Sequence, residues 1–480
     1  MKNETKRASW SGQVAFILAA AASAIGLGNL WRFPYLAAQY GGGTFIAVYL
    51  VLTVTLGFTL MLTEIAIGRK TGQSPLTAYS RLHGAWGFIG ILGTIVPIMV
   101  LPYYCVIGGW VLKYAGAYFN MALTGAQLMG ENAAESGAFF KAFISAPFAP
   151  FGYTMLFILV SSFVIALGVK NGIEKSNLVL MPLLFVIAIG ISVYVIFLPG
   201  SGAGLAYYLV PSMDSLTGPD GKFSVALLGK TVLGAMGQMF YSLSLAMGIM
   251  TTYGSYMRKE DSIEKSVRRI EMFDTIMAII AGLMIVPVVY MFAVKTGTPV
   301  KEAMNAGSGL MFITLPKVFA SLGAAGVWLG AVFFLLVIFA ALTSSISLYE
   351  ACVASICDLL KLERRAAVFF SGSLIAFVAT FSALGYGPWE TVRIFGFQFL
   401  DFFDFISNSV LMPITAAATC IFVGWILKPE AIIGEVEQQN NAFASKRFYS
   451  VMVRWFAPLL VLAILVSEVC RMLNIRGWSI

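Results

Sequence analysis

Long apolar stretches recur along the whole chain and are separated by short polar connections. A helix needs about 20 mostly apolar residues to cross the hydrocarbon core of a bilayer, and the recurring stretches reach or approach that length. The pattern therefore predicts an all-α integral membrane protein with about 11 transmembrane helices. The predicted spans lie at residues 10–38, 45–67, 88–120, 151–168, 178–198, 225–256, 270–294, 327–359, 367–384, 399–427 and 455–472.

Most basic residues of the polar connections lie on one side of these helices. Because loops rich in lysine and arginine stay in the cytosol, this side is predicted to be cytoplasmic, with the N-terminus on it. Arg471 and Arg476, on the opposite side, run against the rule. The basic residues on the predicted cytoplasmic side include Lys2, Lys6, Arg7, Arg69, Lys70, Arg81, Lys170, Lys175, Arg258, Lys259, Arg268, Arg269, Lys361, Arg364, Arg365, Lys446 and Arg447.

The composition agrees with a membrane protein and disfavours other classes. Hydrophobic residues make up 59% of the chain and charged residues 11%, and the formal net charge of +8 reflects the basic cytoplasmic connections. The charge is therefore no argument for a nucleic-acid partner. The single histidine, His83, lies in a predicted cytosolic loop, and the five cysteines contain no CxxC pair. Since no Ser-His-Asp set or metal cluster can be assembled, an enzyme is disfavoured.

Two predicted spans carry glycines and polar residues at their midpoints. The first contains SAIGLGN, from Ser23 to Asn29, and the sixth contains GQMFYSLSLAMG, from Gly237 to Gly248. Glycines weaken a helix, and unwound backbone at membrane depth is tolerated only where it is buried in protein or lines a cavity. These polar breaks therefore predict a binding site.

A dinucleotide loop and a helix-packing face both fit the first break less well than a binding site does. Gly26 and Gly28 form a G-x-G, but no third glycine follows at the spacing of a dinucleotide loop and no strand precedes it. A helix-packing face suits residues 19–22 but not Asn29, whose amide needs partners in hydrocarbon. Spans one and six occupy corresponding places in two five-helix halves, which is typical of a transporter site built on an inverted repeat.

Five motifs spread along the chain carry a resemblance to a known family: SAIGLGNLWRFPY, YGGGTF, GQMFYSLSLAMG, FAALTSSISL and LDFFDF. Through them the chain resembles bacterial members of the neurotransmitter:sodium symporter family over essentially its whole length. The resemblance implies one transporter domain whose core consists of two inverted repeats, 10–198 and 225–427, with helices 1 and 6 unwound at mid-membrane. A peripheral helix at 455–472 would follow this core.

The resemblance also implies two sodium sites made of oxygen ligands, which suit a hard cation. The first would use the carbonyl of Ala24 and the side chains of Asn29, Ser242 and Asp274, together with the substrate carboxylate. The second would use carbonyls of Ala22, Ile25 and Ala340 and hydroxyls of Thr343 and Ser344. Taken alone, these two hydroxyls would be explained as hydrogen-bonding groups between helices.

Asp274 departs from the family pattern, which commonly has asparagine at this place. A fixed carboxylate could replace the chloride that some members require, and Ala278 stands where a serine would be expected, so we predict chloride independence. Tyr49, Gln238 and Ser242 occupy the remaining chloride-site positions. An ionisable residue inside a span is a functional hypothesis by default, and a role for Asp274 in proton coupling stays open.

The substrate site implied by the resemblance lies between the two breaks. N–H groups of Leu27 and Gly28 and the hydroxyl of Tyr104 would bind a carboxylate, and carbonyls near Tyr241 and Ser244 would receive an amine. Because Gly26 stands where monoamine transporters carry aspartate, an α-amino acid is implied, and the mostly apolar slot favours a neutral hydrophobic or aromatic one. The slot residues are Ser23, Val100, Tyr104, Tyr241, Met247, Ser344 and Leu348. Ala246 replaces a glycine of the family near the sixth-span break.

Gates are expected on both sides of this site. Arg32 and Asp404 would pair above it, with Tyr104 and Tyr241 as a lid. On the cytosolic side, the gate residues would be Arg7, Trp10, Tyr256 and Asp358. Glu64 and Glu350 are further intramembrane acids without an identified partner, for which a structural role is expected.

These features predict a sodium-driven symporter that imports an L-amino acid by alternating access across the bacterial inner membrane. Its expected partners are the amino-acid substrate, Na⁺ at two sites and the lipid bilayer. A monomer is sufficient for this mechanism, and the oligomeric state is open. Two alternatives remain: a non-transporting amino-acid sensor on the same fold, and a proton-coupled transporter of the same architecture.

Overall fold

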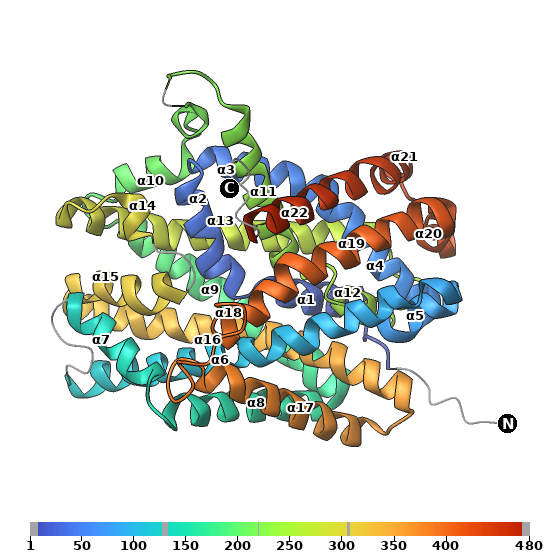
Figure 1. Ribbon diagram of the computed structural model, residues 1–480, viewed down its shortest axis with the longest axis horizontal. Coiled ribbons are helices and arrows are strands. Elements are labelled where there is room, and N and C mark those ends of the chain that lie inside the picture. The colour runs from blue at the N-terminus through green and yellow to red at the C-terminus, as the bar shows by residue number, and fades with distance from the viewer. Residues whose placement is uncertain (1–7, 127–132, 219, 305–307, 473–480) are drawn as a thin grey trace.

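Helices make up nearly all of the regular secondary structure (Figure 1). The computed structural model describes residues 8–126, 133–218, 220–304 and 308–472. In this part of the chain, nine helices are long and apolar enough to cross a membrane. They are Gly43–Thr71, Gly84–Thr124, Ala149–Ala166, Val169–Ile196, Ile263–Thr296, Ala324–Leu360, Arg364–Leu384, Phe399–Ile426 and Lys446–Glu468.

Several of these spans consist of more than one helical segment. The α-helices are α1 (Gln13–Ala24), α2 (Phe33–Gln39), α3 (Gly43–Leu52), α4 (Phe58–Thr71), α5 (Pro75–Leu82), α6 (Phe88–Thr124), α7 (Ala133–Ile144), α8 (Ala149–Ala166), α9 (Lys175–Ile196), α10 (Ser201–Leu209), α11 (Val225–Ser242), α12 (Ile249–Gly254), α13 (Ile263–Thr296), α14 (Val300–Ala303), α15 (Leu315–Ser321), α16 (Ala324–Leu360), α17 (Arg364–Leu384), α18 (Phe399–Asp404), α19 (Met412–Ile421), α20 (Pro429–Val436), α21 (Lys446–Val451) and α22 (Ala457–Met472). Wider π-helical turns occur at η1 (Gly28–Arg32), η2 (Thr53–Gly57), η4 (Val169–Glu174), η6 (Leu310–Thr314), η7 (Phe405–Leu411), η8 (Phe422–Ile426) and η10 (Met452–Phe456).

The first and sixth spans are interrupted, as the sequence predicts. In the first, α1 ends at Ala24 and the helix resumes at Gly28, with a bend of 51° between the two halves. In the sixth, residues 243–248 separate α11 from α12. Together with the nine continuous spans, the bent first span gives ten candidate membrane spans among the described residues. α11 and α12 occupy the position predicted for the sixth span.

α1 and α12, one half of each broken span, lie near the middle of the bundle (Figure 1). α1 packs against α13, α16 and α9, and α12 packs against α4. The long helices α6 and α16 pack along each other and against α8. The unwound backbone is therefore enclosed by protein, which is the condition for its existence at membrane depth.

The sixth-span break uses left-handed backbone and a partner from a neighbouring helix. Ser244, Ala246 and Gly248 have φ of 53°, 58° and 70°, a region that only glycine adopts without strain. The N–H of Ala246 donates to Glu64 Oε1 at 2.7 Å. This contact supplies the partner that the sequence did not identify for Glu64, whose carboxylate accepts a backbone N–H that the break has released.

Replacing Ala246 with glycine is expected to stabilise the fold. Left-handed backbone costs a non-glycine residue roughly 1–2 kcal/mol, and Ala246→Gly removes that cost without removing the N–H that Glu64 accepts. The melting temperature in detergent should therefore rise. The matched control is Ala281→Gly inside α13, where glycine lowers helix stability by about 1 kcal/mol. Equal destabilisation by both variants would contradict the strain argument.

Candidate functional site

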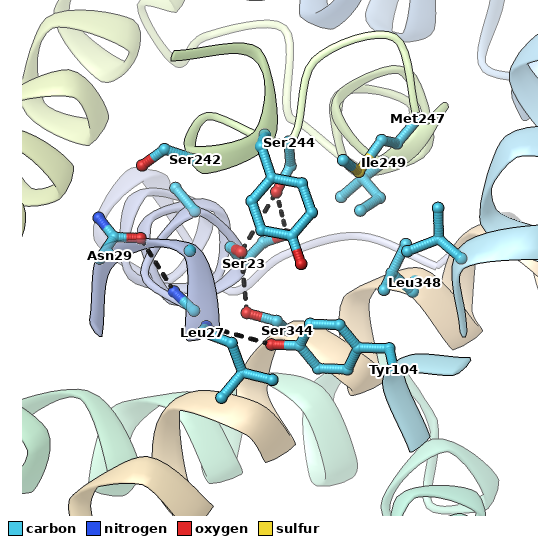
Figure 2. Close-up of a pocket in the computed structure, with 15 residues that line it drawn as sticks. Ser23, Leu27, Asn29, Tyr104, Ser242, Ser244, Met247, Ile249, Ser344 and Leu348 are labelled. Atoms are coloured by element: carbon cyan, nitrogen blue, oxygen red, sulfur yellow. Dashed lines mark hydrogen bonds between the residues drawn. The ribbon is translucent and has the colours of Figure 1, made fainter. Parts of the chain in front are cut away.

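Both breaks open onto one small cavity (Figure 2). Its volume is about 20 Å³, room for little more than a water molecule, so a larger ligand can enter only if side chains move. Every residue predicted for the substrate site lines it. The lining consists of Ser23, Ala24, Gly26, Leu27, Gly28, Asn29, Val100, Tyr104, Tyr241, Ser242, Ser244, Met247, Ile249, Ser344 and Leu348. Ile249 was not predicted, although it begins α12 directly after the glycine that ends the break.

The unwound part of the first span presents polar groups to this cavity. The N–H of Leu27 donates to the hydroxyl of Tyr104 at 3.4 Å. The N–H of Gly26 donates to Asn29 Oδ1 at 3.3 Å, and Gln238 Nε2 donates to the carbonyl of Gly28 at 3.1 Å. Side chains of α6 and α11 thus replace helical hydrogen bonds that the break removes.

The two glycines of this break are required by close packing. A Cβ atom on Gly26 would lie 2.5 Å from Ser344 Oγ and 3.1 Å from the Tyr104 hydroxyl. On Gly28 it would overlap the ring of Tyr241. Neither glycine has a positive φ, so the constraint is space for the opposing side chains rather than backbone conformation.

Asp274 is the polar centre next to the cavity. Its side chain is fully buried. Oδ1 accepts hydrogen bonds from Ser242 Oγ at 2.6 Å and from Asn29 Nδ2 at 2.8 Å, and Oδ2 accepts one from the Tyr49 hydroxyl at 2.8 Å. The three side chains predicted for the first sodium site therefore converge, and Ala24 lines the cavity beside them.

The carboxylate of Asp274 and the hydroxyl of Ser242 fit sodium chemically, because they are hard oxygen ligands of the kind such a cation takes. The amide of Asn29 turns its Nδ2 toward Asp274 and its Oδ1 toward the Gly26 N–H. A buried carboxylate that is surrounded only by neutral donors also carries a negative charge that a bound cation would balance. Asp274 supplies that charge from within the membrane.

The second predicted sodium set lies where α1 faces α16. In an uninterrupted helix the N–H of Gly26 would bond to the carbonyl of Ala22, but it donates to Asn29 instead, which releases that carbonyl. Ser344 Oγ donates to the carbonyl of Ser23 at 3.1 Å, which links the two helices. The remaining residues of the set behave as ordinary helical groups: Thr343 Oγ1 donates to the carbonyl of Ala340 at 3.1 Å, and Ile25 is the last residue to bond back into α1.

The predicted outer pair, Arg32 with Asp404, is not formed. Both residues line a larger cavity of about 620 Å³ on the side predicted to be extracellular, but within the described part of the chain they make no ion pair with each other. The Arg32 guanidinium lies 5.6 Å from the centroid of the Tyr241 ring, whereas Asp404 Oδ1 accepts a hydrogen bond from Asn408 Nδ2 at 2.6 Å. Tyr241 lines both cavities and separates them.

On the opposite side, the structure brings two of the predicted gate residues together. The Trp10 indole N–H donates to the carbonyl of Tyr253 at 3.0 Å. The Trp10 backbone N–H donates to the backbone carbonyl of Tyr256 at 3.1 Å. Asp358 lies at the end of α16, where its Oδ2 accepts the N–H of Ser74 at 2.7 Å. Arg7, the fourth predicted member, falls outside the described residues.

Glu350 also has partners that the sequence did not identify. Its Oε1 accepts hydrogen bonds from the Tyr256 hydroxyl at 2.8 Å and from Arg364 Nη1 at 2.9 Å. Glu350 is fully buried, so this ion pair satisfies a charge that would otherwise be costly in the membrane. The only sign of this ion pair in the sequence was the basic cluster at 361–365, which begins the next connection and contains Arg364.

Glu271 is a buried acid that sequence reasoning missed. It lies one helical turn before Asp274 on α13 and is 3% exposed. Neither of its carboxylate oxygens has a hydrogen-bond partner among the described residues, and Arg268 Nη1 lies 3.6 Å from Oε2. The spacing of three residues to Asp274, which places both acids on one helix face, was a detectable signal.

A helical membrane protein with two broken spans around a buried polar site has the architecture of a secondary transporter. The chain belongs to the sodium:neurotransmitter symporter family, whose profile matches residues 7–137 and 151–478. It is therefore a multi-pass membrane symporter and not an enzyme.

Relatives and a solved structure agree with this assignment over nearly the full chain. An uncharacterized sodium-dependent transporter of Haemophilus influenzae is 30% identical over 482 residues, 97% of this chain and 99% of the relative. The sodium-dependent transporter YhdH of Bacillus subtilis, also uncharacterized, is 32% identical over 474 residues, 97% and 98% of the two chains. The crystal structure of MhsT in complex with L-phenylalanine is similar with a TM-score of 0.82 and 34% identity, covering 96% of this chain and all of that one.

The space constraint at Gly26 predicts the effect of a single methyl group. Gly26→Ala is expected to lower the free energy of unfolding by about 1–3 kcal/mol, because overpacking a rigid site forces neighbouring groups to shift. Thermal unfolding in detergent measures this change. Gly229→Ala is the matched control, since a Cβ there meets nothing within 4 Å. Adding Ser344→Ala should recover part of the loss, and no recovery would mean that the clash lies elsewhere.

Proposed function

We propose that this protein imports a neutral hydrophobic or aromatic L-amino acid together with Na⁺ by alternating access across the bacterial inner membrane. The observation that carries the proposal is the convergence of Asn29, Ser242 and Asp274 beside the cavity formed by the two breaks. A cation held there would lie next to a substrate carboxylate. Binding of the two would then be coupled through direct attraction.

The cavity suits the two ends of an amino acid. The Leu27 N–H and the Tyr104 hydroxyl contact each other, and both would turn toward a substrate carboxylate. The C-terminal end of α11 would present backbone carbonyls to the substrate amine. The apolar walls would take an uncharged side chain. They include Val100, Met247, Ile249 and Leu348. MhsT, which was crystallised with L-phenylalanine, supports an aromatic substrate for this related chain.

Sodium would act at two places with different consequences. In the first site it would bind Asp274 and the substrate carboxylate together. In the second it would join the freed carbonyl of Ala22 to the hydroxyls of Thr343 and Ser344, and so hold α1 against α16. Loss of this ion to a sodium-poor cytosol would release α1 and open the inner side.

Chloride independence is part of this proposal. Asp274 provides a fixed negative charge, and its three hydrogen bonds come from Tyr49, Asn29 and Ser242, two of which hold positions where an anion site would be expected. A second anion beside it would be repelled in this low-dielectric setting. Replacement of chloride by gluconate should leave transport unchanged.

Uptake into proteoliposomes tests the proposal directly. An inward sodium gradient should drive concentrative uptake of a labelled hydrophobic or aromatic L-amino acid, and a potassium gradient should not. Asp274→Ala should reduce sodium-driven uptake at least about tenfold, because hydrogen bonds to a charged group contribute about 1.5–3 kcal/mol. Asn29→Ala should act in the same direction. Asp214→Ala, at an exposed position, is the control, and full activity of Asp274→Ala would refute the first-site assignment.

Glu271 favours a second candidate, proton coupling on the same fold. A buried acid without hydrogen-bond partners among the described residues is a suitable proton carrier. This candidate requires uptake driven by an inward proton gradient in sodium-free buffer, lost in Glu271→Gln and retained in the exposed control Glu260→Gln. The sodium proposal expects no uptake under these conditions. Binding of an amino acid without any flux would instead indicate a sensor.

A further inference from the structure

A surface groove lies between the last two spans on the side that carries the basic connections. Its volume is about 590 Å³, and it is lined by Gly424, Trp425, Lys428, Glu430, Arg454 and Trp455. The two spans meet closely at Gly424, because a Cβ there would be 3.0 Å from the Val453 carbonyl. α20 begins directly after Lys428, at the edge of the groove.

Two tryptophans place the groove at the boundary between membrane and water. Trp425 and Trp455 are 50% and 54% exposed, and their rings meet edge to face with centroids 4.8 Å apart. The Trp425 indole N–H donates to the Arg454 carbonyl at 3.3 Å. Exposed tryptophans with one polar contact are typical of the headgroup level of a bilayer. Exposed Ile426 and Phe456 continue the apolar surface beside them.

The groove carries two cations and one carboxylate. Arg454 is fixed by two contacts: Nε donates to the Gly424 carbonyl at 3.3 Å, and Nη2 lies 3.2 Å from Glu430 Oε1. Its Nη1 group and the Lys428 ammonium have no partner among the described residues. Two positive charges and one negative charge leave the groove with a net charge of +1.

The backbone at Lys428 is held in an unfavourable conformation. Its φ is 67° and its ψ is 141°, a sparsely populated combination that costs a non-glycine residue roughly 1–3 kcal/mol. Lysine therefore occupies a position where glycine would be more stable, at the point where the chain turns from the tenth span into α20. Strain of this kind is often retained where a side chain has a function.

We propose that this groove binds the headgroup of an anionic phospholipid, with its phosphate between Lys428 and Arg454 and its glycerol region against Trp425 and Trp455. The membrane supplies such a ligand at this depth, and anionic lipids attract lysine and arginine near the surface. The guanidinium fork of Arg454 keeps a donor group free for a phosphate oxygen.

The bound lipid would hold the start of α20 in place. The end of the same helix carries Glu435, which pairs with Arg69 Nε at 2.9 Å and with Lys259 Nζ at 2.8 Å. Arg69 lies at the end of the second span, and Lys259 lies in the connection after the sixth. The lipid therefore contacts a helix, α20, that braces the inner ends of the second and sixth spans.

Lipid binding can be measured on the full chain in detergent by native mass spectrometry, independently of transport. The protein is titrated with phosphatidylglycerol and with phosphatidylcholine of the same acyl chains. The wild type should bind phosphatidylglycerol more tightly, and Lys428→Gln should weaken that binding roughly fivefold, since one basic residue near the surface contributes about 1 kcal/mol. Phosphatidylcholine binding should not change.

Two further variants make the result specific. Lys428→Gly removes the charge and relieves the backbone strain, so it should weaken phosphatidylglycerol binding as Lys428→Gln does while keeping or raising the melting temperature. Lys446→Gln removes a basic residue of the same side that already pairs with Glu437 at 3.1 Å, and it should bind as the wild type does. Unchanged phosphatidylglycerol binding in both Lys428 variants would overturn the proposal. Displacement of the lipid by millimolar inorganic phosphate would overturn it as well, because the site would then bind a small anion.

Discussion

A carboxylate buried at the centre of a membrane protein must be satisfied by donors from the protein itself, and much of this structure follows from that requirement at Asp274. Its three hydrogen-bond donors come from three different segments: Tyr49 from α3, Asn29 from η1 and Ser242 from the end of α11. These contacts tie both interrupted spans to α13. Movement of any one segment would remove one of the three hydrogen bonds to a buried charge, which is costly in a low-dielectric interior.

The interrupted spans depend on their neighbours in the same way. Backbone groups released by the breaks find partners on continuous helices: Tyr104 on α6 accepts from Leu27, and Glu64 on α4 accepts from Ala246. The continuous helices thus provide what the broken ones lack. Because the breaks are stabilised from outside, they can expose carbonyl and N–H groups to a ligand without unfolding the bundle.

The sequence located the breaks well because their signal is local. Glycine and amide residues inside an apolar run are visible without knowledge of any neighbour, and the residues expected at the substrate site all line one cavity. Pairings between distant side chains were harder to predict. Whether Glu350 meets Arg364, or Arg32 meets Asp404, depends on how each helix is rotated, and hydrophobic patterning determines that rotation only coarsely.

Glu271 shows a different limit of sequence reasoning. The predicted span began at residue 270 because charged residues precede it, whereas α13 begins at Ile263. The helix continues beyond the apolar stretch, with Ser262 capping its first turn. Glu271 therefore lies inside packed protein rather than at the membrane boundary. The length of an apolar stretch indicates the part of a helix that contacts lipid. It underestimates the length of a helix whose ends are covered by other protein segments.

The two sides of the site are closed in different ways. Toward the predicted cytosol, Trp10, Tyr256, Glu350 and Arg364 form a continuous series of contacts between the start of the first span and α17. Toward the opposite side, the ring of Tyr241 alone is shared by the small cavity and the large one. The ring of Tyr241 is therefore part of the barrier between the two cavities, whereas the inner side is joined by several hydrogen bonds and the ion pair of Glu350 with Arg364.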